Sequence, residues 1–295
     1  MSIDEFIIAV FCFIDDEMEK FLKGKKLRAR GKKPALEDSE VLTMEVVGEF
    51  LGHDGDKAIW EYFKRHWLRF FSKIPCRTSF IRQAANLHIV KNLLQEQIAA
   101  RLGALIDSLH IVDGLPMPVC KFARAHFSQI FKGEATYGYC ATKKEHFYRF
   151  KGHIMISSIG IVTQATFAPA NVDERDVCPE LSERIQGLLL GDKGYIRPEL
   201  KDELKKKGVN LQTPLRDNMK DDRPKAFLKR MLGIRRLVET VIGQLTERFH
   251  IEKIRAKDLW HQYSRFWRKI LAHTVCIALC IENSQKPLQF ERLVH

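Results

Sequence analysis

The sequence predicts a mixed α/β protein, in which a sheet flanked by helices follows an all-helical N-terminal region. Three observations predict this fold class. Apolar residues recur at helical spacing over residues 1–105, where Gly and Pro are confined mostly to connectors. Short apolar and β-branched runs begin near residue 106. Helical patterns interrupt these runs irregularly, which favours a mixed sheet over a regular βαβ repeat.

The first three helices are predicted from their periodicity and their first residues. Apolar and aromatic side chains recur at helical spacing from Phe6 to Phe21. Asp38 and Ser39 are N-cap candidates for a second helix, which continues through VLTMEVVGEF. A third helix, DKAIWEYFKRHWLRFF, is aromatic on one side and basic on the other.

The remaining elements are predicted between residues 109 and 282. LHIVDG predicts a strand that ends at Asp113, and LLLGD predicts another that ends at Asp192. Residues 147–171 predict two longer strands joined by a turn near 157–160. The other predicted elements are a helix within 179–187, a helix ending at Gly208, a strand at 209–214, a basic connector at 215–231, a helix at 234–250 and a last helix through residue 282.

The chain is strongly basic, with 49 Lys and Arg against 37 Asp and Glu and a formal net charge of +12. Such an excess indicates a polyanionic partner, because cations that neutralise phosphates release counterions. Anionic membranes also attract basic chains, but no polybasic amphipathic segment occurs. The N-terminal apolar run ends at Asp15, and the run near 270–281 is shorter than the roughly 18 residues that a membrane span needs. We therefore expect a soluble protein.

The seven cysteines are scattered and odd in number, which argues against a disulfide framework and indicates a reducing cytoplasm. Cys276 and Cys280 lie one helical turn apart, with His273 three residues before Cys276. A zinc site is one interpretation of this spacing, but core cysteines on an apolar helix are the stronger interpretation.

Two aspartates stand at the ends of predicted apolar strands. Asp192 follows Leu188–Leu190 and Gly191, and Asp113 closes LHIVDG in the same way. A single carboxylate in this setting suits a turn, a helix cap or a metal site. Two in matching settings favour a metal site, because the ends of adjacent strands share one sheet edge and hard cations such as Mg²⁺ take oxygen ligands.

A third carboxylate is predicted on the helix that contains IRRLVETVIGQL. At about 100° per residue, Glu239 falls at the border of the apolar stripe that includes Val238 and Val241. From that border, Glu239 could point toward the two aspartates. Arg235, one turn earlier, could contact a carboxylate or a bound phosphate, although a simple i,i+4 surface pair with Glu239 is the structural alternative.

Four motifs closely resemble those of the DDE transposases of bacterial insertion sequences. They are DGLPMPVC from residue 113, YGYCATKKE from residue 137, GDKGY from residue 191 and R-x-x-x-E from residue 235. The resemblance covers most of the chain from about 106 to 250, and PCRTSFIRQAANL (75–87) resembles a segment that precedes the catalytic domain in those enzymes. Three residues depart from the common pattern: Leu232 and Thr246 replace a frequent tyrosine and lysine, and Gly114 replaces a frequent serine.

The resemblance implies an RNase H-like fold and a catalytic triad of Asp113, Asp192 and Glu239. The triad would hold two Mg²⁺ ions, which Mn²⁺ can replace. Arg235 would match an arginine that many of these transposases carry. The implied activity is metal-dependent cleavage that frees a DNA 3′-hydroxyl at an element end, followed by attack of that hydroxyl on target DNA. Synapsis of two element ends implies a homodimer or a larger assembly.

The expected organisation follows from this resemblance. Residues 1–105 would form a helical domain for DNA binding or dimerisation, residues 106–285 an RNase H-like catalytic domain, and residues 286–295 a C-terminal tail. The expected partners are double-stranded element ends and target DNA, with no membrane. The expected location is the cytoplasm, in association with the nucleoid.

Basic residues at several places are predicted to contact DNA. Those that alternate with aromatic residues in one predicted strand region are Lys143, Lys144, Arg149 and Lys151. Lys193 follows an aspartate of the triad, and Arg235 precedes the glutamate, so both could meet a phosphate. In TSFIRQAANL, a recognition helix would present Arg82, Gln83 and Asn86 to base edges.

Three functions remain open from the sequence: an active transposase, a nuclease of the same fold that cuts without joining, and a non-enzymatic DNA-binding protein derived from a transposase. An intact set of Asp113, Asp192 and Glu239 argues against the third, because a binding protein has no need for clustered carboxylates beside phosphates. We favour the active transposase.

Overall fold

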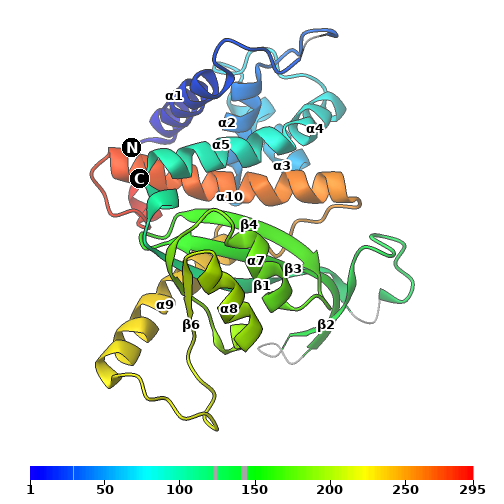
Figure 1. Cartoon of the computed structure of the whole chain (residues 1–295). Helices are drawn as coiled ribbons and strands as arrows, with labels where there is room; N and C mark the ends of the chain where they lie inside the picture. The colour runs from blue at the N-terminus through cyan, green and yellow to red at the C-terminus, as the bar shows by residue number, and fades with distance from the viewer. Residues whose placement is uncertain (29, 122–124, 141–144, 295) are drawn as a thin grey trace. The chain divides into compact units, whose positions relative to one another are not determined.

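The computed structural model in Figure 1 describes residues 1–295 except 29, 122–124, 141–144 and 295, and describes only the backbone of 121, 139, 140 and 145–147. Two compact units make up the chain. Residues Met1–Ile98 and Gln244–His295 form a helical unit, and Ala99–Gly243 form a sheet unit. Within the described ranges, no helix is long and apolar enough to cross a membrane.

The helical unit is built around α2, which is buried along almost its whole length. Its neighbour α1 begins with a capping box, in which the Glu5 backbone N–H donates to Ser2 Oγ and the Ser2 N–H donates to the Glu5 carboxylate. The helices are α1 (Ile3–Leu22), α2 (Asp38–Phe50), α3 (Asp56–His66), α4 (Arg77–Asn86), α5 (His88–Arg101, whose last residues enter the sheet unit) and α10 (Leu259–Glu282), followed by the short η3 (Phe290–Arg292).

The observed units differ from the predicted boundaries of 1–105, 106–285 and 286–295. Helix α10 packs against α2 and α4 in the helical unit, although its residues were predicted to belong to the catalytic domain. The predicted tail is also part of this unit, because Phe290 and Leu293 are buried. The second half of α10, from Ile270 to Ile281, is apolar on nearly every side, so periodicity alone does not specify its partner.

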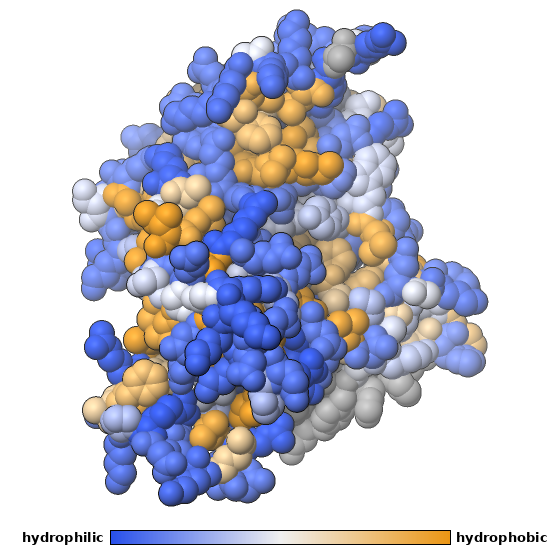
Figure 2. Space-filling model, viewed as in Figure 1, coloured by the Kyte–Doolittle hydropathy of each residue, from blue (hydrophilic) through white to orange (hydrophobic). Residues whose placement is uncertain are grey.

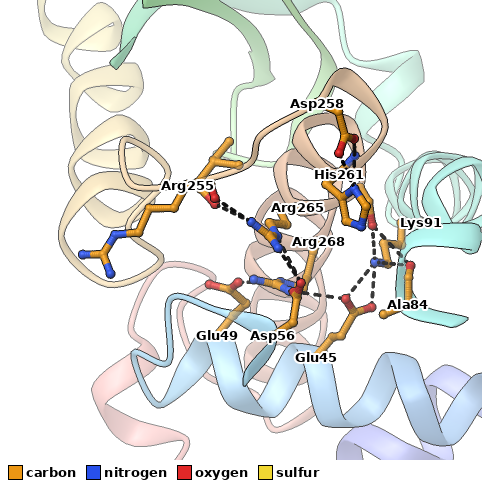
Figure 3. Close-up of polar contacts among 12 residues, drawn as sticks. Glu45, Glu49, Asp56, Ala84, Lys91, Arg255, Asp258, His261, Arg265 and Arg268 are labelled. Atoms are coloured by element: carbon orange, nitrogen blue, oxygen red, sulfur yellow. Dashed lines mark hydrogen bonds and ion pairs between the residues drawn. The ribbon is translucent and has the colours of Figure 1, made fainter. Parts of the chain in front are cut away.

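Six charged side chains that are at most 5% exposed lie together inside the helical unit, and Figure 3 shows most of them. We call this set the buried charge network: Glu45, Glu49, Asp56, Lys91, Arg268 and Lys269.

Helix α10 supplies the central cations of the buried charge network. Arg268 Nε donates to Glu49 at 2.6 Å, and Arg268 Nη1 donates to Asp56. Lys269 Nζ donates to the other Glu49 oxygen at 2.7 Å. Burial pushes the pKa of Asp56 upward, but Arg268 and Arg265 outweigh burial and hold this pKa well below its usual range. These paired charges identify α2 and α3 as the partners of α10.

The cysteine pair on α10 lies in the core of the helical unit. Cys276 and Cys280 are fully buried. The nearby His273 ring forms a hydrogen bond with Gln244. The Gln244 amide nitrogen donates to Leu288 O, so the Gln244 Oε1 atom is the one that faces His273, and it accepts from His273 Nε2 at 3.1 Å. Burial lowers the pKa of His273 to about 3, so the ring is neutral. This packing agrees with the core interpretation of the cysteines.

The sheet unit contains a mixed sheet, as predicted, and six strands of it lie within the described residues. The strands lie in the order β2-β3-β1-β5-β6, and β4 also pairs with β3. Strand β1 is antiparallel to β3 and parallel to β5, which is parallel to β6. The strands are β1 (Leu109–Lys121), β2 (Thr136–Cys140), β3 (Glu145–Ser157), β4 (Val162–Pro169), β5 (Gly187–Leu190) and β6 (Val209–Gln212).

Helices α7 (Glu174–Leu181) and α8 (Pro198–Lys206) cover one face of this sheet. Val112 and Met155 of the central strands pack there against Val177 and Leu204. The outer surface over α7 and α8 is mostly hydrophilic in Figure 2. Successive strand residues face opposite sides, so Asp113 lies on the other face from Val112.

Strand β1 was predicted to end at Asp113, but it continues to Lys121. The extension pairs only with β3, because pairing with β5 stops at Ile111. Pro116 and Pro118 are tolerated because this part of β1 is an edge on its other side. The two prolines therefore mark an edge segment rather than the end of the strand.

Three helix starts also differ from the predictions. Helix α9 (Lys225–Glu247) includes part of the predicted connector 215–231, because Pro224 precedes the helix and does not interrupt it. Helix α7 begins at Glu174 after its N-cap Asp173, earlier than the predicted 179–187. The N-cap of α2 is Glu37, one residue before the candidates. The strand pair joined near 157–160 and the helix before Gly208 are confirmed.

Replacing Arg268 with methionine should strongly destabilise the helical unit. Breaking a buried ion pair from one side costs about 3–5 kcal/mol, and Arg268→Met removes the guanidinium from Glu49 and Asp56. Urea unfolding followed by tryptophan fluorescence measures this effect, because all four tryptophans belong to the helical unit. Lys57→Met removes a surface partner of Glu61 and should shift the midpoint little. Equal shifts for the two variants would contradict this role of Arg268.

The helical unit should lose stability as the pH falls from about 6.5 toward about 3, the folded pKa of His273. Below its unfolded pKa, His273 binds a proton in the unfolded chain but not in the folded one, so acid favours unfolding. His273→Gln should flatten this dependence by up to about 1.4 kcal/mol per pH unit. Urea midpoints at pH 7, 6, 5 and 4 provide the test, with the exposed His66→Gln as control. An unchanged slope in His273→Gln would refute the assignment.

Candidate active site

The pairing of β1 with β5 brings Asp113 and Asp192 to the same edge of the sheet. The last pair of this parallel ladder joins Ile111 to Leu190. Asp113 and Asp192 each follow their own strand's member of that pair by two residues. The two carboxylates repel each other enough to contribute to the raised pKa of Asp113. The matching strand-end positions predicted from the sequence therefore correspond to real proximity.

Backbone amides hold both aspartates in place. The Gly114 N–H donates to Asp113 Oδ1 at 2.8 Å. The Gly194 N–H donates to Asp192 Oδ1, also at 2.8 Å, and Asp192 is the N-cap of the short helix η2 (Lys193–Tyr195). Asp192 is thus a helix cap, and it makes this contact with Oδ1. Asp107, six residues before Asp113, accepts from the Leu109 and Ser158 N–H groups, so it acts as a loop acid that holds the backbone before β1.

Helix α9 contributes Glu239 and Arg235 to this edge. Arg235 Nη1 donates to Asp113 Oδ2 at 3.3 Å, and Arg235 Nη2 donates to Glu239 Oε1 at 2.5 Å. The i,i+4 pair of Arg235 and Glu239 therefore exists, but it is not only a surface pair, because the same guanidinium reaches the first aspartate. Arg235 links the carboxylates of two distant sequence motifs.

The electrostatics of Asp113 are those of a crowded anionic site. The pKa of Asp113 is raised to about 6. Burial is the largest cause, and the negative charges of Asp192 and Glu239 add to it, against the Gly114 hydrogen bond and the Arg235 charge. A raised pKa of this kind indicates a carboxylate that would gain from a nearby cation.

Glu174, at the first turn of α7, lies beside the same edge and was missed from the sequence. Its Oε1 pairs with Lys151 Nζ. Burial lowers the pKa of Lys151, and so does Arg149, whereas Asp192 and Asp113 act in the opposite direction. The sequence carries a signal for Glu174, because an N-cap aspartate followed by acidic residues indicates a helix start at 174. The later predicted start at 179 concealed it.

The predicted DNA contacts fall in different environments. Lys143 and Lys144 lie outside the described residues. Arg149 is 93% buried, against the position of Gly138, so it does not lie on an exposed surface as predicted. Lys151 is engaged by Glu174, and Lys193 pairs with Asp217 at 3.1 Å.

The predicted recognition helix corresponds to α4 of the helical unit. Arg82 and Asn86 are exposed on α4, which fits a surface role. Gln83 is buried and donates to Leu36 O and Asp38 Oδ1, each at 2.9 Å. Gln83 therefore stabilises the packing of α4 and is not available to base edges.

The chemistry of the site suits a hard divalent cation. All the candidate ligands are carboxylate oxygens, the set that Mg²⁺ and Mn²⁺ prefer. Within the described part of the chain, no group of three or more His, Cys, Asp or Glu has the arrangement of a metal site. Arg235 and Lys151 instead pair with the carboxylates. Glu174 Oε2 is buried, with no hydrogen-bond partner among the described residues, so the donor set has an unused oxygen.

Solved structures that are similar to this chain include two transposase complexes. One is a piggyBac transposase synaptic complex with hairpin DNA, at 11% identity and a TM-score of 0.49, covering 98% of this chain and 76% of that chain. The other is a pre-cleavage Mos1 transpososome, at 13% identity and a TM-score of 0.22, covering 91% of this chain and 85% of that chain. No curated protein matches the sequence.

A family model described as a transposase DDE domain matches residues 103–259, which is more than half of the chain. The match includes Asp113, Asp192 and Glu239. It also agrees with the motifs of the sequence and with the mixed sheet that carries them. The chain belongs to the transposase DDE domain family.

Proposed function

We propose that this protein is the transposase of an insertion sequence, which cleaves DNA 3′ ends and joins them to target DNA with Asp113, Asp192 and Glu239 as its catalytic carboxylates. Family membership supports a transposase. The observation that carries the choice of residues is the convergence of two aspartates beyond the Ile111–Leu190 pair, with Arg235 contacting both Asp113 and Glu239.

The carboxylates of this chain would hold two Mg²⁺ ions, or Mn²⁺ ions in their place. When bound, such ions neutralise charge at the scissile phosphate and lower the pKa of an attacking water. The protein's own contribution is position. The Gly114 and Gly194 amides fix one oxygen of each aspartate, and Arg235 orients Glu239. Fixed carboxylates need no rearrangement when a phosphate enters the site.

Double-stranded DNA is the partner that this activity requires, as element ends and as target. Two ends must be held together for transposition, so we propose a homodimer or a larger synaptic assembly. A cytoplasmic protein associated with the nucleoid would meet both DNA substrates. The net charge of +12 supports DNA binding.

Helix α9 offers a basic surface that leads to the site. Figure 1 shows its first half extending beyond the sheet. Lys225, Lys229 and Arg236 are exposed, and at about 100° per residue they lie within about 40° of one another around the helix. This basic stripe of α9 spans about 16 Å along the axis and ends one turn before Glu239. Its position suits the backbone of a DNA strand that approaches the carboxylates.

Replacing Asp192 with asparagine should abolish both chemical steps while DNA binding persists. The amide oxygen of Asp192→Asn can still accept from the Gly194 N–H, so the cap survives and only the charge is lost. Cleavage and joining of DNA with the element's own ends, in Mg²⁺ or Mn²⁺, should fall about a hundredfold or more. Asp202→Asn on the surface of α8 is the control with the same charge change.

The two other candidate functions give different results in that assay. Metal-dependent cleavage without joining in the wild type would favour a nuclease of this fold. DNA binding with no chemistry in the wild type or the variants would favour a non-enzymatic DNA-binding protein. Full activity in Asp192→Asn would refute Asp192 as a catalytic carboxylate.

Neutralising the basic stripe of α9 should weaken DNA binding in a salt-dependent way. Replacing Lys225, Lys229 and Arg236 with glutamine should reduce the slope of log K against log salt by about 2.7, since each phosphate contact contributes about 0.9. Fluorescence anisotropy with labelled duplex DNA measures the slope. The same three-charge change at the C-terminal end of α8 and its cap (Lys205, Lys206 and Lys207) is the control. Equal losses in the two triple variants would argue against a specific stripe.

A further inference from the structure

The fourth carboxylate at the site, Glu174, is held by its own local structure. Asp173 caps α7 by accepting from the Arg175 N–H at 2.9 Å, and the Arg175 and Arg197 guanidinium groups both contact the Asp173 carboxylate. The cap fixes Glu174 in the first turn of the helix. Its side chain is 81% buried, which is unusual for a glutamate with one oxygen lacking a partner among the described residues.

Two glycines leave the space that the Glu174 carboxylate occupies. A Cβ at Gly114 would lie 2.9 Å from Lys151 Cε, the partner of Glu174, and 3.4 Å from Glu174 Oε1. A Cβ at Gly194 would lie 3.2 Å from Glu174 Oε2 and 2.9 Å from Asp192 Oδ1. Neither glycine has a positive φ, so backbone conformation does not require glycine at these positions. Glycine is needed at these two positions because a side chain would not fit. Gly114 directly follows Asp113, and Gly194 follows Asp192 by two residues.

The charge balance of the site changes when Glu174 is included. Asp113, Asp192 and Glu239 face the cations of Arg235 and Lys151, which leaves one formal negative charge. With Glu174 the site carries two formal negative charges while Lys151 is in place, and three once the Lys151 ammonium is displaced, so it attracts a divalent cation more strongly. Lys151 is the side chain that pairs with Glu174, and Asp113 and Asp192 also act electrostatically on its ammonium group. The Lys151 ammonium thus lies at a position where the carboxylates of Glu174, Asp113 and Asp192 attract a small cation.

We propose that Glu174 is a fourth carboxylate of the cation site, which binds the divalent cation together with Asp113 and Asp192 and exchanges it for Lys151. The inference rests on the proposed function, because it takes the two aspartates as ligands. It adds a ligand from α7, a helix that carries none of the three residues of the triad. Carboxylate oxygens on α7 and at the edge of β1 and β5 then form one site.

Binding of Mn²⁺ to the full chain without DNA, measured by isothermal titration calorimetry, tests the proposal. Glu174→Gln keeps the shape of the side chain and removes its charge, and it should weaken Mn²⁺ binding about 10–100-fold. Glu180→Gln makes the same change on the exposed side of α7 and should leave binding unchanged. Circular dichroism and the urea midpoint establish that each variant is folded. Wild-type affinity in Glu174→Gln would overturn the proposal.

A double variant separates a ligand from a residue that only neutralises Lys151. If Glu174 merely compensates that ammonium, Glu174→Gln combined with Lys151→Met should bind Mn²⁺ as the wild type does, and this result would overturn the proposal. If Glu174 is a ligand, the double variant should stay weak while Lys151→Met alone binds at least as tightly as the wild type.

Asp113→Asn distinguishes failure of this inference from failure of the proposed function. Weak binding in Asp113→Asn with normal binding in Glu174→Gln refutes only the role of Glu174. Normal binding in both variants refutes the metal site itself, and the proposed function with it.

Discussion

The parallel pairing of β1 with β5 is the constraint on which the site depends. Its register joins Ile111 to Leu190, and each aspartate stands two residues further along its strand. A slip of one residue would move a side chain to the opposite face of the sheet, because successive residues alternate. The buried Leu189 and Leu190 and the buried Ile111 and Val112 fix this register through packing. Core packing thereby determines where two charges meet.

Placing several carboxylates together has an electrostatic cost, and the fold offsets it with cations and with backbone donors. Arg235 lies between Asp113 and Glu239, and Lys151 pairs with Glu174. The cost is still visible in the pKa of Asp113, which burial and its acidic neighbours raise to about 6. The helical unit solves the same problem differently, since its buried acids have protein cations as permanent partners.

Much of this arrangement could be predicted from local sequence patterns. Apolar strand runs predicted β5 and the start of β1. The border position of Glu239 on its helix predicted that it could point toward the aspartates, and Arg235 links it to Asp113. Contacts between distant segments could not be predicted in this way. Arginine is usually found at the protein surface, and Arg149 was therefore predicted to be exposed, but its side chain packs over Gly138 of the neighbouring strand. Glu174 was missed because Pro179, which lies inside α7, suggested a later helix start.

The division of the chain into units has a consequence for the order of folding during synthesis. The sheet unit is contiguous from residue 99 to residue 243, whereas the helical unit needs segments from both ends of the chain. Glu45, Glu49 and Asp56 are made before the sheet unit, but Arg268 and Lys269 are made only after it. Until then the early helices lack the cations that let their acids be buried. The sheet unit can thus fold before α10 has been made, while residues 1–98 cannot yet form the complete helical unit. A nascent or truncated chain therefore has its carboxylate site before it has a complete helical unit.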